Sequence, residues 1–207
     1  MPVMIPTKEN RRLNSDYYVE GYATTFDQPY LMFEYDGWKY YEEVDRHSFD
    51  ECDMSDVLFQ FNHAGKVYAR TRMGNNKPAT MIVEPDNVGL FIAADLSLTA
   101  GSRQMFEDID AGLIHQMSIG FTVAVDEIIR DEAARIITRR IIKFKKLYDA
   151  SAVDLPANPN TEISARTWID GVIETMSREE TAKRERNRKK LKLLIDMEVK
   201  THDTCRN

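Results

Sequence analysis

Apolar and polar residues alternate with a period of two over much of the region from residue 16 to about 165. Because successive side chains of a β-strand point to opposite faces of its sheet, this alternation predicts a mostly β domain. Turn-forming residues at 27–29 and 84–87 separate strands from their neighbours. Five segments are the predicted strands: YYVEGYATTF (17–26), DVLFQFNH (56–63), VGLFIAADLSL (88–98), MSIGFTVAV (117–125) and RIITRRIIKFKKLY (135–148).

Short helices are expected between these strands. In the segment LTAGSRQMFEDIDAGLIHQ (98–116), Ser102 can cap a helix and Gly112 can end it. Between them, Met105, Phe106 and Ile109 form one apolar stripe. This pattern predicts a strand, helix, strand unit, and a second short helix is expected over about 42–52.

The composition of the chain changes after residue 157. The segment NPNTEISAR (158–166) is typical of a linker, and a helical stretch is expected from about 168 to 199. Within it, TAKRERNRKKLK (181–192) has almost no large apolar residue, so a solvated helix is the favoured interpretation, and an acidic or nucleic-acid partner is the alternative. The predicted organisation is an N-terminal arm (1–15), a β domain (16–165) and a charged helical tail (166–207).

Length, charge and cysteine content narrow the function classes. The 207 residues, 43% of them apolar, suffice for one domain with an appendage, and a net charge of -6 argues against a wholly basic nucleic-acid binder. Cys52 and Cys205 form neither a disulfide framework nor a clustered metal site. No apolar run approaches the roughly 18 residues of a membrane span. A soluble protein without a metal or cofactor is therefore expected.

Ser118 is the candidate nucleophile. It lies in the predicted strand 117–125, where one face is apolar and the other carries small residues, namely Ser118, Gly120, Thr122 and Ala124. A bare face permits the close approach of either a packed element or a substrate backbone. By itself the segment favours close packing over catalysis, because short motifs carry little information without context.

A catalytic serine needs a base, and the chain offers four histidines. His202 lies in the tail, His47 lies in an acidic, solvated stretch, and His115 precedes Ser118 by three residues. His63 differs from these because it ends a predicted apolar strand and is followed by Ala-Gly. Alone it is more often a structural histidine, but together with Ser118 it becomes the candidate general base.

A third group should orient the imidazole and stabilise its protonated form. Asp149, in LYDASAVDLPANP (147–159), is one candidate and His115 is the other. A turn aspartate that accepts hydrogen bonds from backbone amides is an almost equally good interpretation of Asp149.

Four segments in this order resemble the tailed-phage prohead proteases, a family of head-maturation serine proteases related in fold to the herpesvirus assemblins. They are EGYATTFDQP (20–29), LFQFNHAG (58–65), GLIHQMSIGF (112–121) and LYDASAVDLPANP (147–159). The resemblance covers most of residues 16–165. It implies an α+β, mostly β fold: an assemblin-like β-barrel flanked by short helices, with a C-terminal helical extension.

The resemblance also implies a function. The chain is expected to be a serine endopeptidase that cuts the major capsid protein, scaffold segments and itself inside the assembling prohead, in the host cytoplasm. Ser118 matches the nucleophile and His63 the general base. Asp149 stands where relatives often have Glu in an E-V-S run, and His115 stays an alternative because assemblins use a second histidine. A homodimer and a tail that is trimmed after targeting the shell are further expectations.

Three other interpretations remain at this point. The main alternative is a non-enzymatic β-barrel protein for capsid assembly or scaffolding. A second is an adaptor that binds nucleic acid through its basic tail segment, which would show strong salt dependence. The third is a cysteine hydrolase based on Cys52, although nothing in the sequence places a histidine beside it.

Overall fold

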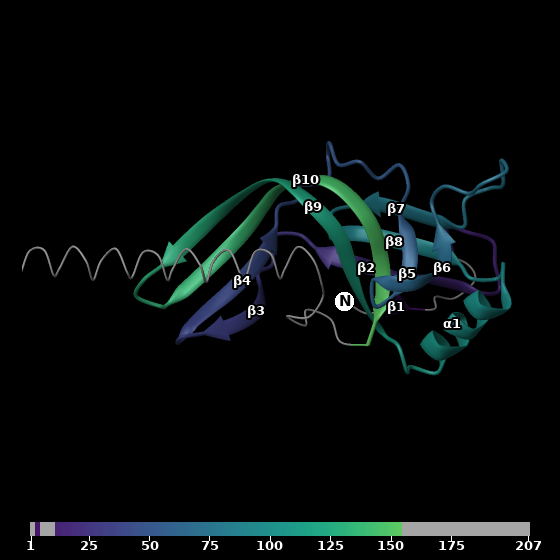
Figure 1. The fold of residues 1–207 in the computed structure, drawn as a ribbon, viewed down its shortest axis with the longest axis horizontal. Coiled ribbons are helices and arrows are strands. Elements are labelled where there is room, and N and C mark those ends of the chain that lie inside the picture. Colours follow the sequence, from purple (N-terminus) through teal and green to yellow (C-terminus); the bar gives the residue numbers. More distant parts are fainter. Residues whose placement is uncertain (1–2, 5–10, 155–207) are drawn as a thin grey trace, which may run out of the picture. The chain divides into compact units, whose positions relative to one another are not determined.

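The computed structural model describes residues 3–4 and 11–154 (Figure 1). The linker and the predicted helical tail lie outside the described residues, as does most of the predicted N-terminal arm. The elements are β1 (Val3–Met4), β2 (Tyr18–Thr25), β3 (Tyr30–Tyr35), β4 (Trp38–Val44), β5 (Leu58–Phe61), β6 (Ala64–Arg70), β7 (Met81–Pro85), β8 (Gly89–Asp95), α1 (Ala100–Asp110), β9 (Gln116–Asp131) and β10 (Ile136–Val153). The predicted mostly β fold is confirmed.

The strands pair into two sheets. One sheet has the order β1-β2-β8-β7, and the other has the order β3-β4-β10-β5-β6 with β9 alongside β10. Strand β9 pairs antiparallel with β10 along its length, while β4 and β5 pair parallel with the beginning and the end of β10, respectively. The ladders of the described residues show no closed barrel.

Strands β9 and β10 form a long, curved hairpin (Figure 1). Their register shifts at several points between Ile141 and Asp149, and such bulges bend a strand pair and increase its twist. Beyond the bend, residues 124–131 of β9 are exposed, whereas the last five residues of β10 are all buried. The end of the hairpin near Val153 therefore lies against the core.

The main core cluster unites side chains from both sheets and from α1. Each fully buried Leu, Ile or Phe side chain contributes about 1.5–3 kcal/mol. The cluster includes Val19 and Ala23 of β2, Leu90 and Ile92 of β8, Phe59 of β5, Met105 and Ile109 of α1, Met117 of β9, and Leu147, Ala150 and Ala152 of β10. The core thus fixes the positions of β5, β9 and β10 relative to one another.

Helix α1 begins and ends close to the predicted positions. Its N-cap is Thr99 and not Ser102, because the Thr99 side chain accepts a hydrogen bond from the Ser102 backbone N–H at 3.1 Å. Gly112, with a φ of +74°, follows the C-cap as predicted. Met105 and Ile109 are buried, which confirms the apolar stripe.

The helix expected over 42–52 is wrong. Residues 42–44 form the end of β4, and hydrogen-bonded turns follow over 46–51. Tertiary contacts are the reason. The Glu42 side chain is buried and accepts a hydrogen bond from Arg139 of β10, so strand pairing overrides the local helical pattern. The structure also adds β1, β3, β4, β6 and β7 to the five predicted strands.

Candidate active site

The register of β9 against β10 groups four small or polar residues on one face. Ser118 lies directly opposite Ser151, and Gly120 lies directly opposite Asp149. Directly opposed residues of an antiparallel pair have Cα atoms about 4.5–5.5 Å apart and share a face. On the other face, Met117 is buried in the core. The predicted division of this strand into an apolar face and a bare face is therefore confirmed.

His63 lies in the tight turn between β5 and β6. Phe61 pairs with Ala64, so Asn62 and His63 form a two-residue hairpin turn with φ values of +49° and +57°. The prediction that His63 is the last residue of a strand is wrong, because the strand ends at Phe61 and His63 lies in the turn. The Asn62 backbone N–H donates to the carbonyl of Ala152 at 3.0 Å, which anchors the turn to β10.

This turn brings His63 to Asp149. The imidazole Nδ1 lies 2.7 Å from Asp149 Oδ1, and the two side chains are only 10% and 9% exposed. A carboxylate can only accept hydrogen bonds, so Nδ1 carries a hydrogen, and in the neutral form of this ring Nε2 is the nitrogen with the free lone pair. This is the tautomer that a general base requires.

The Asp149 carboxylate has two further close neighbours. The hydroxyl of Ser151, a fully buried residue, donates to the same Oδ1 at 2.5 Å. The other oxygen, Oδ2, lies over Gly120, where an added Cβ would come within 2.0 Å of it. Sequence reasoning gave neither residue a role. The signal for Ser151 is its position two residues after Asp149, on the same face of the strand.

The side chains of the remaining candidates make no hydrogen bond to this group across the described ranges. The described part of the chain shows no hydrogen bond between half-buried Ser118 and His63. His115 is exposed and lies just before β9, and His47 contacts Asp50 at 3.2 Å in an exposed turn. Of the two candidates for the third residue, the structure therefore brings only Asp149 to His63.

Cys52 is partly buried, and this burial raises the pKa of its thiol to about 11. A thiol with so high a pKa is protonated at neutral pH, whereas a nucleophilic cysteine must be a thiolate. The cysteine-hydrolase interpretation is therefore disfavoured.

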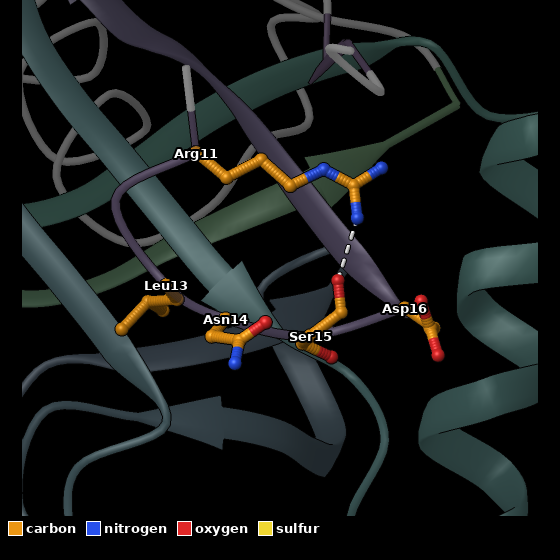
Figure 2. A pocket seen from close by; sticks show the side chains of 5 residues that line it. All are labelled: Arg11, Leu13, Asn14, Ser15 and Asp16. Atoms are coloured by element: carbon orange, nitrogen blue, oxygen red, sulfur yellow. Dashed lines mark hydrogen bonds between the residues drawn. The ribbon is translucent and has the colours of Figure 1, made fainter. Parts of the chain in front are cut away.

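A small cavity of about 140 Å³ lies elsewhere, lined by residues 11 and 13–16 (Figure 2). Within it, the guanidinium of Arg11 donates to the carbonyl of Ser15 at 2.6 Å. None of the candidate site residues lines this cavity. Across residues 3–4 and 11–154, no group of three or more His, Cys, Asp or Glu side chains could hold a metal ion, and no helix is long and apolar enough to cross a membrane.

Comparison with known proteins agrees with the resemblance seen in the four segments. The family model described as Caudovirus prohead serine protease matches residues 4–183. The matched region includes β2 to β10 and all three candidate residues, Ser118, His63 and Asp149. Searches of the curated proteins and of the solved structures found no match.

Proposed function

Because the chain belongs to the Caudovirus prohead serine protease family, we propose that Ser118, His63 and Asp149 are its catalytic residues. Family membership establishes a serine protease that processes capsid proteins during head maturation. The observation that carries the residue assignment is the 2.7 Å contact between His63 Nδ1 and Asp149 Oδ1, next to a strand that presents Ser118 on the same face.

The proposed mechanism follows from these positions. Ser118 Oγ attacks the carbonyl carbon of the scissile peptide bond while His63 Nε2 takes its proton. Asp149 stabilises the imidazolium, which then protonates the leaving amine as the tetrahedral intermediate collapses to an acyl-enzyme. Water, deprotonated by the same Nε2, hydrolyses the ester and regenerates Ser118.

The geometry supports Asp149 over His115 as the third residue. Proton transfer requires Nε2 to come within about 2.6–3.2 Å of the serine oxygen, and this contact is often longer in a free enzyme than in its substrate complex. Ser118 lies opposite Ser151, so it is the diagonal neighbour of Asp149 on the same face. An imidazole held by Asp149 is thus near Ser118, whereas the exposed His115 lies outside this arrangement.

We extend the proposal to the partners that the resemblance implies. The substrates include scaffold segments and the chain itself, cleavage takes place inside the assembling prohead in the host cytoplasm, and the protease works as a homodimer. Intact mass of the purified chain over time tests self-cleavage, and light scattering of an inactive variant tests the dimer. A chain of constant mass would remove the first proposal, and a monomer at all concentrations would remove the second.

Co-expression with the capsid and scaffold proteins of the same phage tests the residue assignment. Intact mass follows cleavage for the parent chain and for Ser118→Ala, His63→Ala and Asp149→Ala, with folding checked by circular dichroism. We expect cleavage by the parent and a loss of at least about 10³-fold in the first two variants. Cleavage that persists in Ser118→Ala would overturn the assignment. Assembled heads with uncut capsid protein in the parent would favour the scaffold alternative.

The pH dependence of cleavage provides a second test. Protonated His63 cannot accept the serine proton, so the rate should rise with pH through the titration range of histidine, near 6.5 for an unperturbed side chain. A flat profile between about pH 5 and 8 would contradict the role of His63 as the base.

A further inference from the structure

Ser151 shares an acceptor oxygen with the candidate base. Both the Ser151 hydroxyl and His63 Nδ1 donate to Asp149 Oδ1, at 2.5 Å and 2.7 Å. Ser151 is 0% exposed, and a buried hydroxyl without a partner would be destabilising. Its hydrogen bond is made to the charged group of the site, where hydrogen bonds are about twice as strong as those between neutral groups.

The carboxylate of Asp149 needs such a restraint to hold one orientation. With His63 as its single donor, it could turn about its Cβ–Cγ bond and present either oxygen to the ring. Ser151 lies two residues further along the same strand, in the buried end of β10. Its hydrogen bond to Oδ1 keeps that oxygen, and not Oδ2, on the side of the His63 ring. On the opposite side, Oδ2 lies against Gly120, where there is no side chain.

We propose that Ser151 is a positioning residue for the protease reaction: through Asp149, it holds the His63 ring so that Nε2 faces Ser118. This inference rests on the proposed catalytic residues. In the described part of the chain Ser151 makes no hydrogen bond to His63, so it acts through the carboxylate, whose orientation it restricts. Its complete burial and its engaged hydroxyl also distinguish it from Ser118, the serine opposite to it, which is only half-buried.

Removal of the hydroxyl should therefore affect proton transfer and leave substrate binding unchanged. In Ser151→Ala we expect the rate of Ser118 acylation to fall about tenfold, which corresponds to about 1.4 kcal/mol of transition-state free energy. Without the Ser151 hydrogen bond, the Asp149 carboxylate would also interact more strongly with the imidazole, and this interaction favours the protonated ring over the neutral one. The acid limb of the pH profile should accordingly move to higher pH. Asp149 is the charged side chain that contacts His63 in the described part of the chain.

The experiment measures phosphonylation of the full chain by a fluorophosphonate probe, which needs no capsid substrate. Ser118 Oγ forms a bond to phosphorus, the P–F bond breaks, fluoride leaves and His63 takes the serine proton. Peptide mass mapping identifies the labelled serine, and initial rates are recorded from pH 5 to 9. The chains compared are the parent, Ser151→Ala, Asp149→Ala, the double variant, and Ser48→Ala as a matched control.

Ser48 is a suitable control because it is also a fully buried serine, yet its hydroxyl has no hydrogen-bond partner among the residues that the structure describes. We expect Ser48→Ala to label at the parental rate. In the double variant, Ser151→Ala should cause no loss beyond that of Asp149→Ala, because Ser151 acts only through that carboxylate.

Two results would overturn the role of Ser151. One is an equal loss of rate from Ser151→Ala with and without Asp149. The other is a lower melting temperature with an unmoved pH profile, which is the mark of a purely structural residue. Failure of the underlying assignment looks different: labelling would map to a serine other than Ser118, or Asp149→Ala would label as fast as the parent.

Discussion

Gly120→Ala is the most direct test of how tightly the carboxylate of Asp149 is confined. The added Cβ would lie 2.0 Å from Asp149 Oδ2 and 3.0 Å from its Cγ. Gly120 has no positive φ, so alanine meets no backbone strain there and the clash involves the Asp149 carboxylate alone. The carboxylate is held by two donors and cannot move aside without weakening them.

The size of the effect follows from these distances. Real Cβ atoms essentially never approach another atom within 3.0 Å, so Oδ2 must retreat by at least about 1 Å. A displacement of about 1 Å in an active site can lower a rate about 10²-fold, or about 2.7 kcal/mol of transition-state stabilisation. Overpacking a buried site destabilises the fold by about 1–3 kcal/mol, which leaves a folded protein to assay.

Cleavage of the capsid protein and thermal unfolding should both be measured for this variant. Gly74→Ala is the matched control, because a Cβ there meets nothing within 4 Å and its φ is not positive. We expect parental activity from Gly74→Ala and about 1% of it from Gly120→Ala. Parental cleavage by a folded Gly120→Ala would refute the idea that the Asp149 carboxylate must hold this position.

Three other variants probe the remaining chemistry. Cys52→Ser should keep parental cleavage, and the parental thiol should react slowly with iodoacetamide at pH 7, because burial raises its pKa to about 11. Arg139→Ala should lower the free energy of unfolding by about 3–5 kcal/mol in urea titrations, since buried Glu42 loses its cationic partner and keeps the neutral Tyr30 hydroxyl as a donor. Burial would raise the pKa of Asp45, but a backbone N–H and Arg140 outweigh it and lower that pKa. Asp45→Asn should therefore reduce stability at pH 7, and the reduction should disappear as the pH falls through the lowered pKa of Asp45.

The candidate nucleophile could be predicted from local sequence because its signal is local. Strand periodicity alone places Ser118 and Gly120 on the face opposite to Met117, and the structure agrees. Helix α1, which precedes them, could be predicted equally well, since its apolar stripe and terminal glycine are short-range features. Patterns of this kind depend on neighbours a few residues apart, which a sequence displays directly.

The partners of Asp149 could not be predicted in the same way. His63 and Asp149 are 86 residues apart, and only the pairing of β5 with β10 brings them together. A register shift between Leu147 and Asp149 decides which β10 residues face His63, and a one-residue slip would turn Asp149 to the other face. A second long-range pairing, of β4 with β10, explains why no helix forms at Glu42, since the local sequence pattern does not show that a parallel strand lies beside it.

The turn that presents His63, the proposed general base, has a backbone conformation that is unfavourable for histidine. Left-handed backbone conformations destabilise residues other than glycine by about 1–2 kcal/mol, and Asn-Gly is the preferred pair for such a hairpin, yet the second position here is histidine. His63→Gly and His63→Ala remove the imidazole equally, but only glycine suits the φ of +57°. We therefore expect both variants to be inactive and the glycine variant to be the more stable in urea by about 1 kcal/mol. An alanine variant of equal or greater stability would mean that this backbone conformation is not retained in solution. The turn would then not explain why the His63 side chain lies beside Asp149.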